Sequence, residues 1–145
     1  LFTHYHKLWA SSQYLKRFSV PQKPQDLDHH RLLVFSLDKQ KSILYGDWLT
    51  WLLYAGSTSG RPRKPFLEFT SQSGLLNAAC KGYGILQSPQ EWIHLRKAEL
   101  VEILPQLEGP QIEVFYIFNK RNTSAQKIDA LYKHLQASLK QKFSL

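Results

Sequence analysis

The sequence predicts a single α/β (α+β) domain over residues 1–145, in which a mixed sheet of about four strands is flanked by helices. Short apolar runs of strand length alternate along the chain with longer segments of helical periodicity. Hydrophobic residues make up 43% of the 145 residues, which is enough for one packed core. The one cysteine, Cys80, excludes an internal disulfide framework, so the core has to supply the stability.

The first half of the chain is predicted to contain one helix and two strands. Aromatic and apolar residues recur at helical spacing in residues 2–18, which predicts a helix followed by a proline-containing connector. The apolar run at 31–37 predicts a strand, and the run at 42–54 predicts its hairpin partner. A helical turn over residues 48–54 fits the same pattern equally well, so both alternatives stay open.

The middle of the chain is predicted to form a third strand and two helices. The strand covers residues 66–69, and a short helix follows at 75–81 with Gly82 in the left-handed position. The sequence Ser-Pro-Gln-Glu at 88–91 has the form of a capping box with proline at the first helical position. It predicts a helix that continues to about residue 104.

The last quarter of the chain is predicted to form a strand and a helix. The apolar run at 112–118 predicts the strand, and Thr123 with Gln126 predicts the start of the helix. An apolar stripe then recurs at Ile128, Leu131, Leu135 and Leu139, so this face should contact the core or a partner subunit. The predicted order of elements is α-β-β-β-α-β-α.

The charge of the chain favours a polyanionic partner. Lys and Arg number 19 against 11 Asp and Glu, giving a formal net charge of +8 at pH 7. DNA is the favoured partner, with RNA as a second choice. The single cysteine favours a reducing, intracellular location, and no apolar run approaches the roughly 20 residues that span a membrane. The apolar stripes would also suit a homo-oligomer.

The most informative segment is the basic loop at residues 59–65, Ser-Gly-Arg-Pro-Arg-Lys-Pro. It resembles an AT-hook, in which an extended backbone directs arginines into the minor groove of A·T-rich DNA. The resemblance implies that Arg61, Arg63 and Lys64 project from the loop and contact nucleic acid, helped by Lys120 and Arg121. The alternative is a solvated loop whose prolines and charges protect a strand edge.

The predicted order of elements also resembles the core of the restriction-endonuclease-like, or PD-(D/E)xK, nuclease superfamily. That resemblance implies that Asp47 on the second strand and Glu68 on the third hold Mg²⁺ and form a catalytic site. Thr70 stands where the family has its catalytic lysine, so Lys64 or Gln72 would have to take that role.

Three functions therefore compete. The leading interpretation is a basic intracellular domain that binds nucleic acid, most plausibly DNA. The first alternative is an Mg²⁺-dependent endonuclease that uses Asp47, Glu68 and Lys64, and no cofactor is expected otherwise. The second alternative is a non-catalytic subunit or adaptor whose charge serves only to keep the protein dissolved.

Overall fold

The structure is a computed structural model that describes residues 1–36, 47–118 and 125–143. The chain divides into two compact units. The larger unit comprises residues 5–110, and the smaller unit comprises residues 1–4 and 111–145. No helix in the described ranges combines the length and the apolar character needed to cross a membrane.

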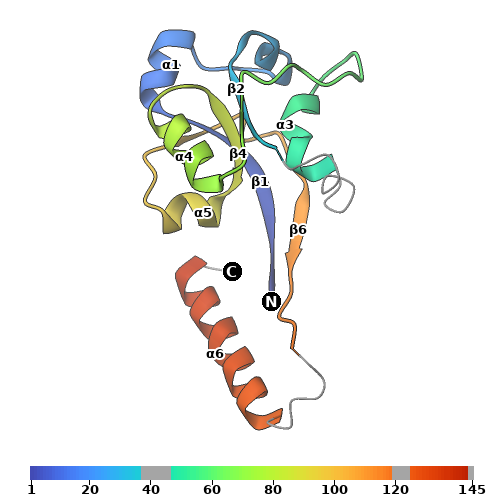
Figure 1. Cartoon of the computed structure of the whole chain (residues 1–145), viewed down its shortest axis with the longest axis vertical. Helices are drawn as coiled ribbons and strands as arrows, with labels where there is room; N and C mark the ends of the chain where they lie inside the picture. Colours follow the sequence, from blue (N-terminus) through green and yellow to red (C-terminus); the bar gives the residue numbers. More distant parts are fainter. Residues whose placement is uncertain (37–46, 119–124, 144–145) are drawn as a thin grey trace. The chain divides into compact units, whose positions relative to one another are not determined.

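The described elements alternate between strands and short helices (Figure 1). In chain order they are β1 (Phe2–Ala10), α1 (Ser12–Phe18), the 3-10 helix η1 (Pro24–His29), β2 (Leu32–Phe35), the 3-10 helix η2 (Asp47–Thr50), α3 (Trp51–Tyr54), β3 (Leu67–Phe69), α4 (Gln72–Cys80), β4 (Ile85–Pro89), α5 (Gln90–Leu95), β5 (Val101–Ile103), β6 (Gln111–Val114) and α6 (Ala125–Phe143).

The sheet is mixed, which confirms the predicted fold class. Its strands follow the order β3-β2-β4-β1-β5, and β6 also pairs with β1. β2 is parallel to both β3 and β4, with Leu33 opposite Leu67 on one side and Leu86 on the other. β1 runs antiparallel to β4 and β5. The described sheet thus has six strands rather than about four, and its parallel part is the three-stranded β3-β2-β4 segment.

Helices cover both faces of the sheet in the larger unit. On one face, Leu8, Leu32 and Ile85 pack with side chains of α1, η1 and α3. On the other face, neighbouring residues of the same strands pack with side chains of α4 and α5, including Leu75 and Ile93. Figure 1 shows α4 and α5 beside β4. Since alternate residues of β1, β2 and β4 face opposite layers, these strands are apolar on both sides, as is typical of buried strands.

The smaller unit contains the start of β1, β6 and α6 but contributes little to the buried core. All buried hydrophobic side chains among the described residues lie between Leu8 and Leu104. In the smaller unit, Phe115 and Ile117 are 68% and 87% exposed, and Leu131 of α6 is 48% exposed. The rings of Tyr116 and Tyr132 are 6.0 Å apart and connect the end of the β6 segment to α6.

The predicted helix at 2–18 is wrong for its first half, which is strand β1. Spacing of three to four residues between aromatic side chains suggested one helical face, but Leu8, Trp9 and Ala10 are all buried. Trp9 lies in one layer of the core, and Leu8 and Ala10 lie in the other. A strand buried on both faces has no clear alternation, so its periodicity does not identify it.

The predicted helix from residue 88 to about 104 is also wrong. Ser88 and Pro89 complete strand β4, and the helix α5 that follows has only six residues. Pro89 takes the N-cap position and makes no side-chain cap hydrogen bond. The capping-box pattern was present in the sequence, but parallel pairing of β4 with β2 and its antiparallel pairing with β1 determine the strand.

Other predicted elements are confirmed or partly confirmed. Strands β2 and β3 and helix α6 lie where they were expected, and α4 is followed by Gly82 with φ +77°. Of the two alternatives left open for residues 48–54, the helical turn is confirmed, because residues 47–54 form η2 and α3 rather than a strand. Residues 42–46 and the predicted helix start at Thr123 lie outside the described residues.

Candidate functional site

The three parallel strands of the larger unit end at one edge of the sheet, here called the carboxyl edge. β2 lies in the centre, and the chain passes from β2 to β3 on one side and then back to β4 on the other. The connection that leaves β2 leads through α3 on one face of the sheet to β3, and the connection that leaves β3 leads through α4 on the other face back past β2 to β4. In open α/β sheets, ligands bind outside the carboxyl ends of strands at this kind of topological switch point.

Hydroxyl side chains lie at or just beyond the carboxyl ends of the three parallel strands. Ser36 follows β2, and its N–H donates to the carbonyl of Phe69 at the end of β3, 2.8 Å away. Thr70 and Ser71 follow β3 directly, and the Ser71 Oγ caps α4 by accepting from the N–H of Gly74 at 3.3 Å. Ser88 lies near the end of β4. These are the residue types that position polar ligands.

A buried polar cluster supports the elements beside this edge. The Gln87 Oε1 accepts from the N–H of Leu52 at 2.7 Å, and its Nε2 donates to the carbonyl of Trp48 at 2.7 Å. The same Nε2 lies 3.1 Å from the Nδ1 of His6. The His6 ring meets Trp48 edge-on with centroids 5.4 Å apart. Gln87 of β4 therefore fixes η2 and the start of α3 to the sheet.

The helix that follows β4 carries an acceptor without a protein donor among the described residues. One carboxylate oxygen of Glu91, Oε2, is enclosed and has no hydrogen-bond partner among the described residues. Glu91 lies in the first turn of α5, directly after β4. Enclosed polar atoms are nearly always hydrogen-bonded, so this oxygen is a candidate acceptor for a water or a ligand donor.

A separate cleft of about 640 Å³ lies between the start of α1, one face of α4 and the loop after α5. Cys80 contributes to its lining together with Ser73, Asn77 and Arg96. Burial raises the pKa of the Cys80 thiol, so the thiol stays protonated at neutral pH. A raised thiol pKa is typical of an unreactive cysteine.

The basic loop has a different geometry from the one predicted for Arg63. The side chain of Arg63 is only 8% exposed. The guanidinium donates to Asp28 at 2.5 Å, to the carbonyl of Ala55 at 2.7 Å and to that of Pro24 at 3.2 Å. The expected projection of Arg63 from the loop is therefore wrong, because three acceptors hold the side chain against the protein.

The structure describes two of the four other residues that were predicted to contact nucleic acid. Arg61 and Lys64 are both exposed, one on each side of Arg63, so DNA contact through them stays a prediction. Lys120 and Arg121 lie outside the described residues.

Of the two residues predicted to hold Mg²⁺, Glu68 lies on the expected strand and Asp47 does not. Asp47 begins the 3-10 helix η2 rather than lying on a second strand, and its side chain is outside the described part. Glu68 is exposed on β3, which is parallel to β2 and forms the end of the strand order. Within the described ranges, no group of three or more His, Cys, Asp or Glu side chains could hold a metal ion.

Sequence reasoning missed the carboxyl edge. Ser36, Thr70, Ser71 and Ser88 come together because three separate strands are parallel neighbours. A hydroxyl residue directly after an apolar run, as in Phe35-Ser36 and Phe69-Thr70-Ser71, was the available signal. That signal becomes informative only when the strand order is known.

The fold and its edge define an α/β domain with helices on both faces of a partly parallel sheet, the class in which small molecules bind at carboxyl ends of strands. The family model of the LysR substrate binding domain matches residues 1–140. The chain therefore belongs to the LysR substrate binding domain family.

The relatives are regulators of transcription by name. The chain is similar to an uncharacterised HTH-type transcriptional regulator of Haemophilus influenzae, with 30% identity over 118 residues that cover 77% of this chain and 38% of the relative. It is 25% identical to the HTH-type transcriptional regulator YhjC of Escherichia coli over 141 residues, covering 91% of this chain and 44% of YhjC. The chain thus spans about two fifths of the length of these relatives.

Solved structures show the same fold. The regulatory domain of CrgA, a LysR-type transcriptional regulator from Neisseria meningitidis, superimposes with a TM-score of 0.64 and 22% identity over 93% of this chain and 66% of that chain. The regulatory domain of AphB from Vibrio vulnificus gives a TM-score of 0.66 and 18% identity over 95% of this chain and 66% of that chain.

These comparisons overturn the nuclease resemblance. The family match and the structural neighbours are LysR-type domains, and none of those reported is a PD-(D/E)xK nuclease. The element order that suggested the nuclease rested on a helix at residues 2–10 and a strand at residues 47–54, where the structure has a strand and two short helices.

Proposed function

We propose that this chain is the effector-binding part of a LysR-type transcriptional regulator, in which a small polar molecule binds at the carboxyl edge and alters the action of the regulator on DNA. The match of the LysR substrate binding domain to residues 1–140 carries the proposal. The names of the relatives support the link to transcription. The proposal includes DNA binding, self-association and an intracellular location. The location follows because a regulator acts where the DNA is.

The chemistry of the carboxyl edge supports a small ligand with both an anionic group and a hydrogen-bond donor. The first turn of α4 contains no acidic residue, so its backbone N–H groups and dipole favour a negative group. The enclosed Oε2 of Glu91 would accept from a ligand N–H or O–H. The hydroxyls of Ser36 and Thr70 can either donate or accept. Small organic acids and amino acids fit this set.

A binding experiment on the 145-residue chain tests this proposal. A panel of small organic acids and amino acids is screened by thermal shift, and each ligand found is titrated by calorimetry. The double variant Ser36→Ala, Thr70→Val should weaken binding about 5- to 20-fold, the loss expected for one or two hydrogen bonds. Thr70→Val keeps the volume of the side chain and removes the hydroxyl.

Ser138→Ala on the exposed side of α6 is the matched control for loss of a hydroxyl and should leave the affinity unchanged. A ligand whose affinity is the same in the wild type and in the double variant binds elsewhere, which would contradict the assignment of the carboxyl edge. Equal weakening by the control and the double variant would contradict it as well.

A further inference from the structure

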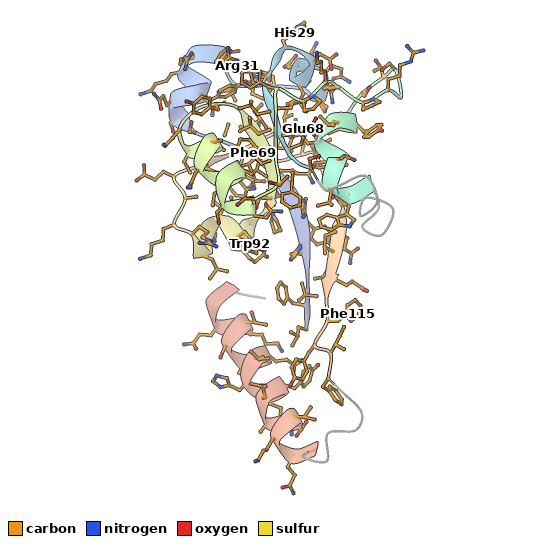
Figure 2. All side chains as sticks on the ribbon, in the orientation of Figure 1. His29, Arg31, Glu68, Phe69, Trp92 and Phe115 are labelled. Carbon is orange, nitrogen blue, oxygen red and sulfur yellow. The ribbon has the colours of Figure 1, made fainter. Side chains whose placement is uncertain are left out.

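The larger unit carries an ordered basic surface at the end of the sheet opposite the carboxyl edge, where β2 and β3 begin. Arg17 is near the end of α1, Arg31 directly precedes β2, and the basic loop leads into β3. Figure 2 shows Arg31 and His29 at this end of the unit, with Glu68 farther along β3. We call the set Arg17, Arg31, Arg61 and Lys64 the basic surface.

Two aromatic rings contact two of the four cations of this surface, Arg17 and Arg31. The guanidinium of Arg31 lies between two rings, 4.8 Å from the centroid of Phe18 and 4.5 Å from that of Phe66. The guanidinium of Arg17 lies 5.3 Å from the Phe18 centroid. Phe66 is fixed in turn, because its N–H donates to the carbonyl of Leu32 at 2.8 Å. Cation–π contacts hold such side chains in place without neutralising their charge.

The buried Arg63 holds the loop that supplies the other two cations. Its hydrogen bonds to Asp28, Ala55 and Pro24 fix the backbone between Arg61 and Lys64, both of which remain exposed. An ordered cation loses less side-chain and loop entropy when it binds a ligand than a flexible one does. The loop therefore presents Arg61 and Lys64 from a fixed base.

The acids near the basic surface are already engaged. Asp28 accepts from Arg63, and the carboxylate of Asp26 accepts from the N–H groups of Gln22 and Lys23 at 2.9 and 3.1 Å. The ion pairs found in the described part of the chain are Lys7–Glu102, Arg63–Asp28 and Lys133–Asp129. None of the four cations of the basic surface belongs to one of these pairs, so their charge is available to a partner.

From this arrangement we propose that the basic surface binds the phosphate backbone of DNA, as a contact additional to effector binding at the carboxyl edge. A polyanion matches a group of cations that form no ion pair within the described residues, and arginine pairs well with phosphate oxygens. The surface binds without reading bases, since Arg63, which the AT-hook pattern assigned to the minor groove, points into the protein. This proposal rests on the proposed function in one respect, which is the choice of DNA as the polyanion.

The test measures binding of the full chain to a labelled DNA duplex by fluorescence anisotropy over a series of salt concentrations, without effector. The variant Arg61→Gln, Lys64→Gln should bind about 3- to 10-fold more weakly at low salt. The slope of log affinity against log salt should fall by about 1 to 2, since each lost phosphate contact contributes about 0.9. Arg31 and Arg63 are left intact because they hold the structure together.

The control Lys127→Gln, Lys140→Gln removes the same charge from exposed positions of α6 and should keep the wild-type slope. An equal loss of DNA affinity and of salt slope in both variants would show an effect of net charge and would overturn the proposal. Wild-type binding to vesicles of anionic phospholipid without binding to DNA would overturn it too. Because effector titration uses no DNA and this assay uses no effector, failure of either proposal is seen separately.

Discussion

At the scale of single residues, the side chain of Arg63 joins two segments that are distant in the sequence. Its guanidinium connects the loop after α3 to η1 through two carbonyls and one carboxylate. Guanidinium has five N–H donors in a planar fork, so it can satisfy acceptors that come from different directions. The residue that the basic motif assigned to DNA therefore stabilises the fold.

Truncation of Arg63 should destabilise the protein. Arg63→Ala leaves the carbonyls of Ala55 and Pro24 without this donor, and we expect the free energy of unfolding in urea to fall by about 2–3 kcal/mol. Arg63→Lys should recover only part of the loss, because an ammonium lacks the planar fork. Arg61→Ala, an exposed change in the same loop, should stay within about 0.5 kcal/mol of the wild type. Similar losses at both positions would contradict a specific role for Arg63.

A second residue-scale feature is the hydrogen-bond chain from Arg31 through Tyr14 to His30. The Tyr14 hydroxyl accepts from the N–H of Arg31 at 2.9 Å and lies 3.0 Å from the Nδ1 of His30. The hydroxyl hydrogen can therefore be donated to an unprotonated Nδ1. Burial is the main cause that lowers the pKa of His30 below its ordinary 6.5, with Asp26 acting against it and His29 acting in the same direction as burial.

The lowered pKa of His30 predicts a stability that decreases in mild acid. Above the ordinary pKa of 6.5 both folded and unfolded His30 are neutral, and the contribution to stability is fully present. As the pH falls below that value, the unfolded chain binds a proton first, and stability is lost until the pH passes through the lower folded pKa. Urea midpoints measured from about pH 8 to about pH 5 should fall less in His30→Gln than in the wild type. An identical fall would exclude His30 as a source.

At the scale of elements, the burial of the two faces of a strand or helix decides how much that element contributes to the stability of the protein. Leu52 of α3 is 0% exposed and packs in the core, and its N–H is held by Gln87. The stripe on α6 was predicted to face the core or a partner subunit, and in the structure Leu131 is 48% exposed and Leu135 is only partly buried. The pattern identified the helix correctly, and contact of its apolar face with a partner subunit stays a prediction.

Leucine truncations should therefore differ between α3 and α6. Leu52→Ala creates a cavity in a packed core and should lower the free energy of unfolding by about 2–5 kcal/mol. Leu131→Ala removes a half-exposed side chain and should cost less than about 1 kcal/mol. Equilibrium urea unfolding of the two variants, followed by tryptophan fluorescence, measures the difference. A loss at Leu131 as large as that at Leu52 would show that α6 is buried in solution.

At the scale of the whole molecule, the core is concentrated in the larger unit. The buried hydrophobic side chains of the described residues span Leu8 to Leu104, and both layers of that core contact the same strands. The larger unit also contains the carboxyl edge and the basic surface. A unit with its own two-layer core is expected to fold without the rest of the chain.

A fragment of residues 5–110 should fold cooperatively. All four tryptophans lie within it, so a sigmoidal urea transition in fluorescence would report the core directly. Its m-value should be smaller than that of the full chain, in proportion to the surface lost. A gradual, non-cooperative change in fluorescence would contradict independence of the larger unit. The fragment 111–145, which lacks a buried hydrophobic side chain among its described residues, should show no cooperative urea transition in circular dichroism.

The sequence by itself determined the elements that are marked by residues close together in the chain. The short helix before Gly82 is encoded by the left-handed position that glycine accepts readily, with φ +77° in the structure. The strand at β2, the stripe of α6 and the α/β class follow from short-range pattern and composition. The net charge of +8 likewise belongs to the sequence and indicates a polyanionic partner before any fold is known.

Tertiary structure alone decided the identity of β1 and β4, the direction of Arg63 and the carboxyl edge. β1 and β4 are strands because each pairs with neighbours on both sides, and their two buried faces remove the periodicity that would mark them. Arg63 turns inward because Asp28, 35 residues away, and two carbonyls surround it. Ser36, Thr70 and Ser88 meet at one edge because β3, β2 and β4 are parallel neighbours. Such contacts join residues far apart in the chain, so no local pattern can specify them.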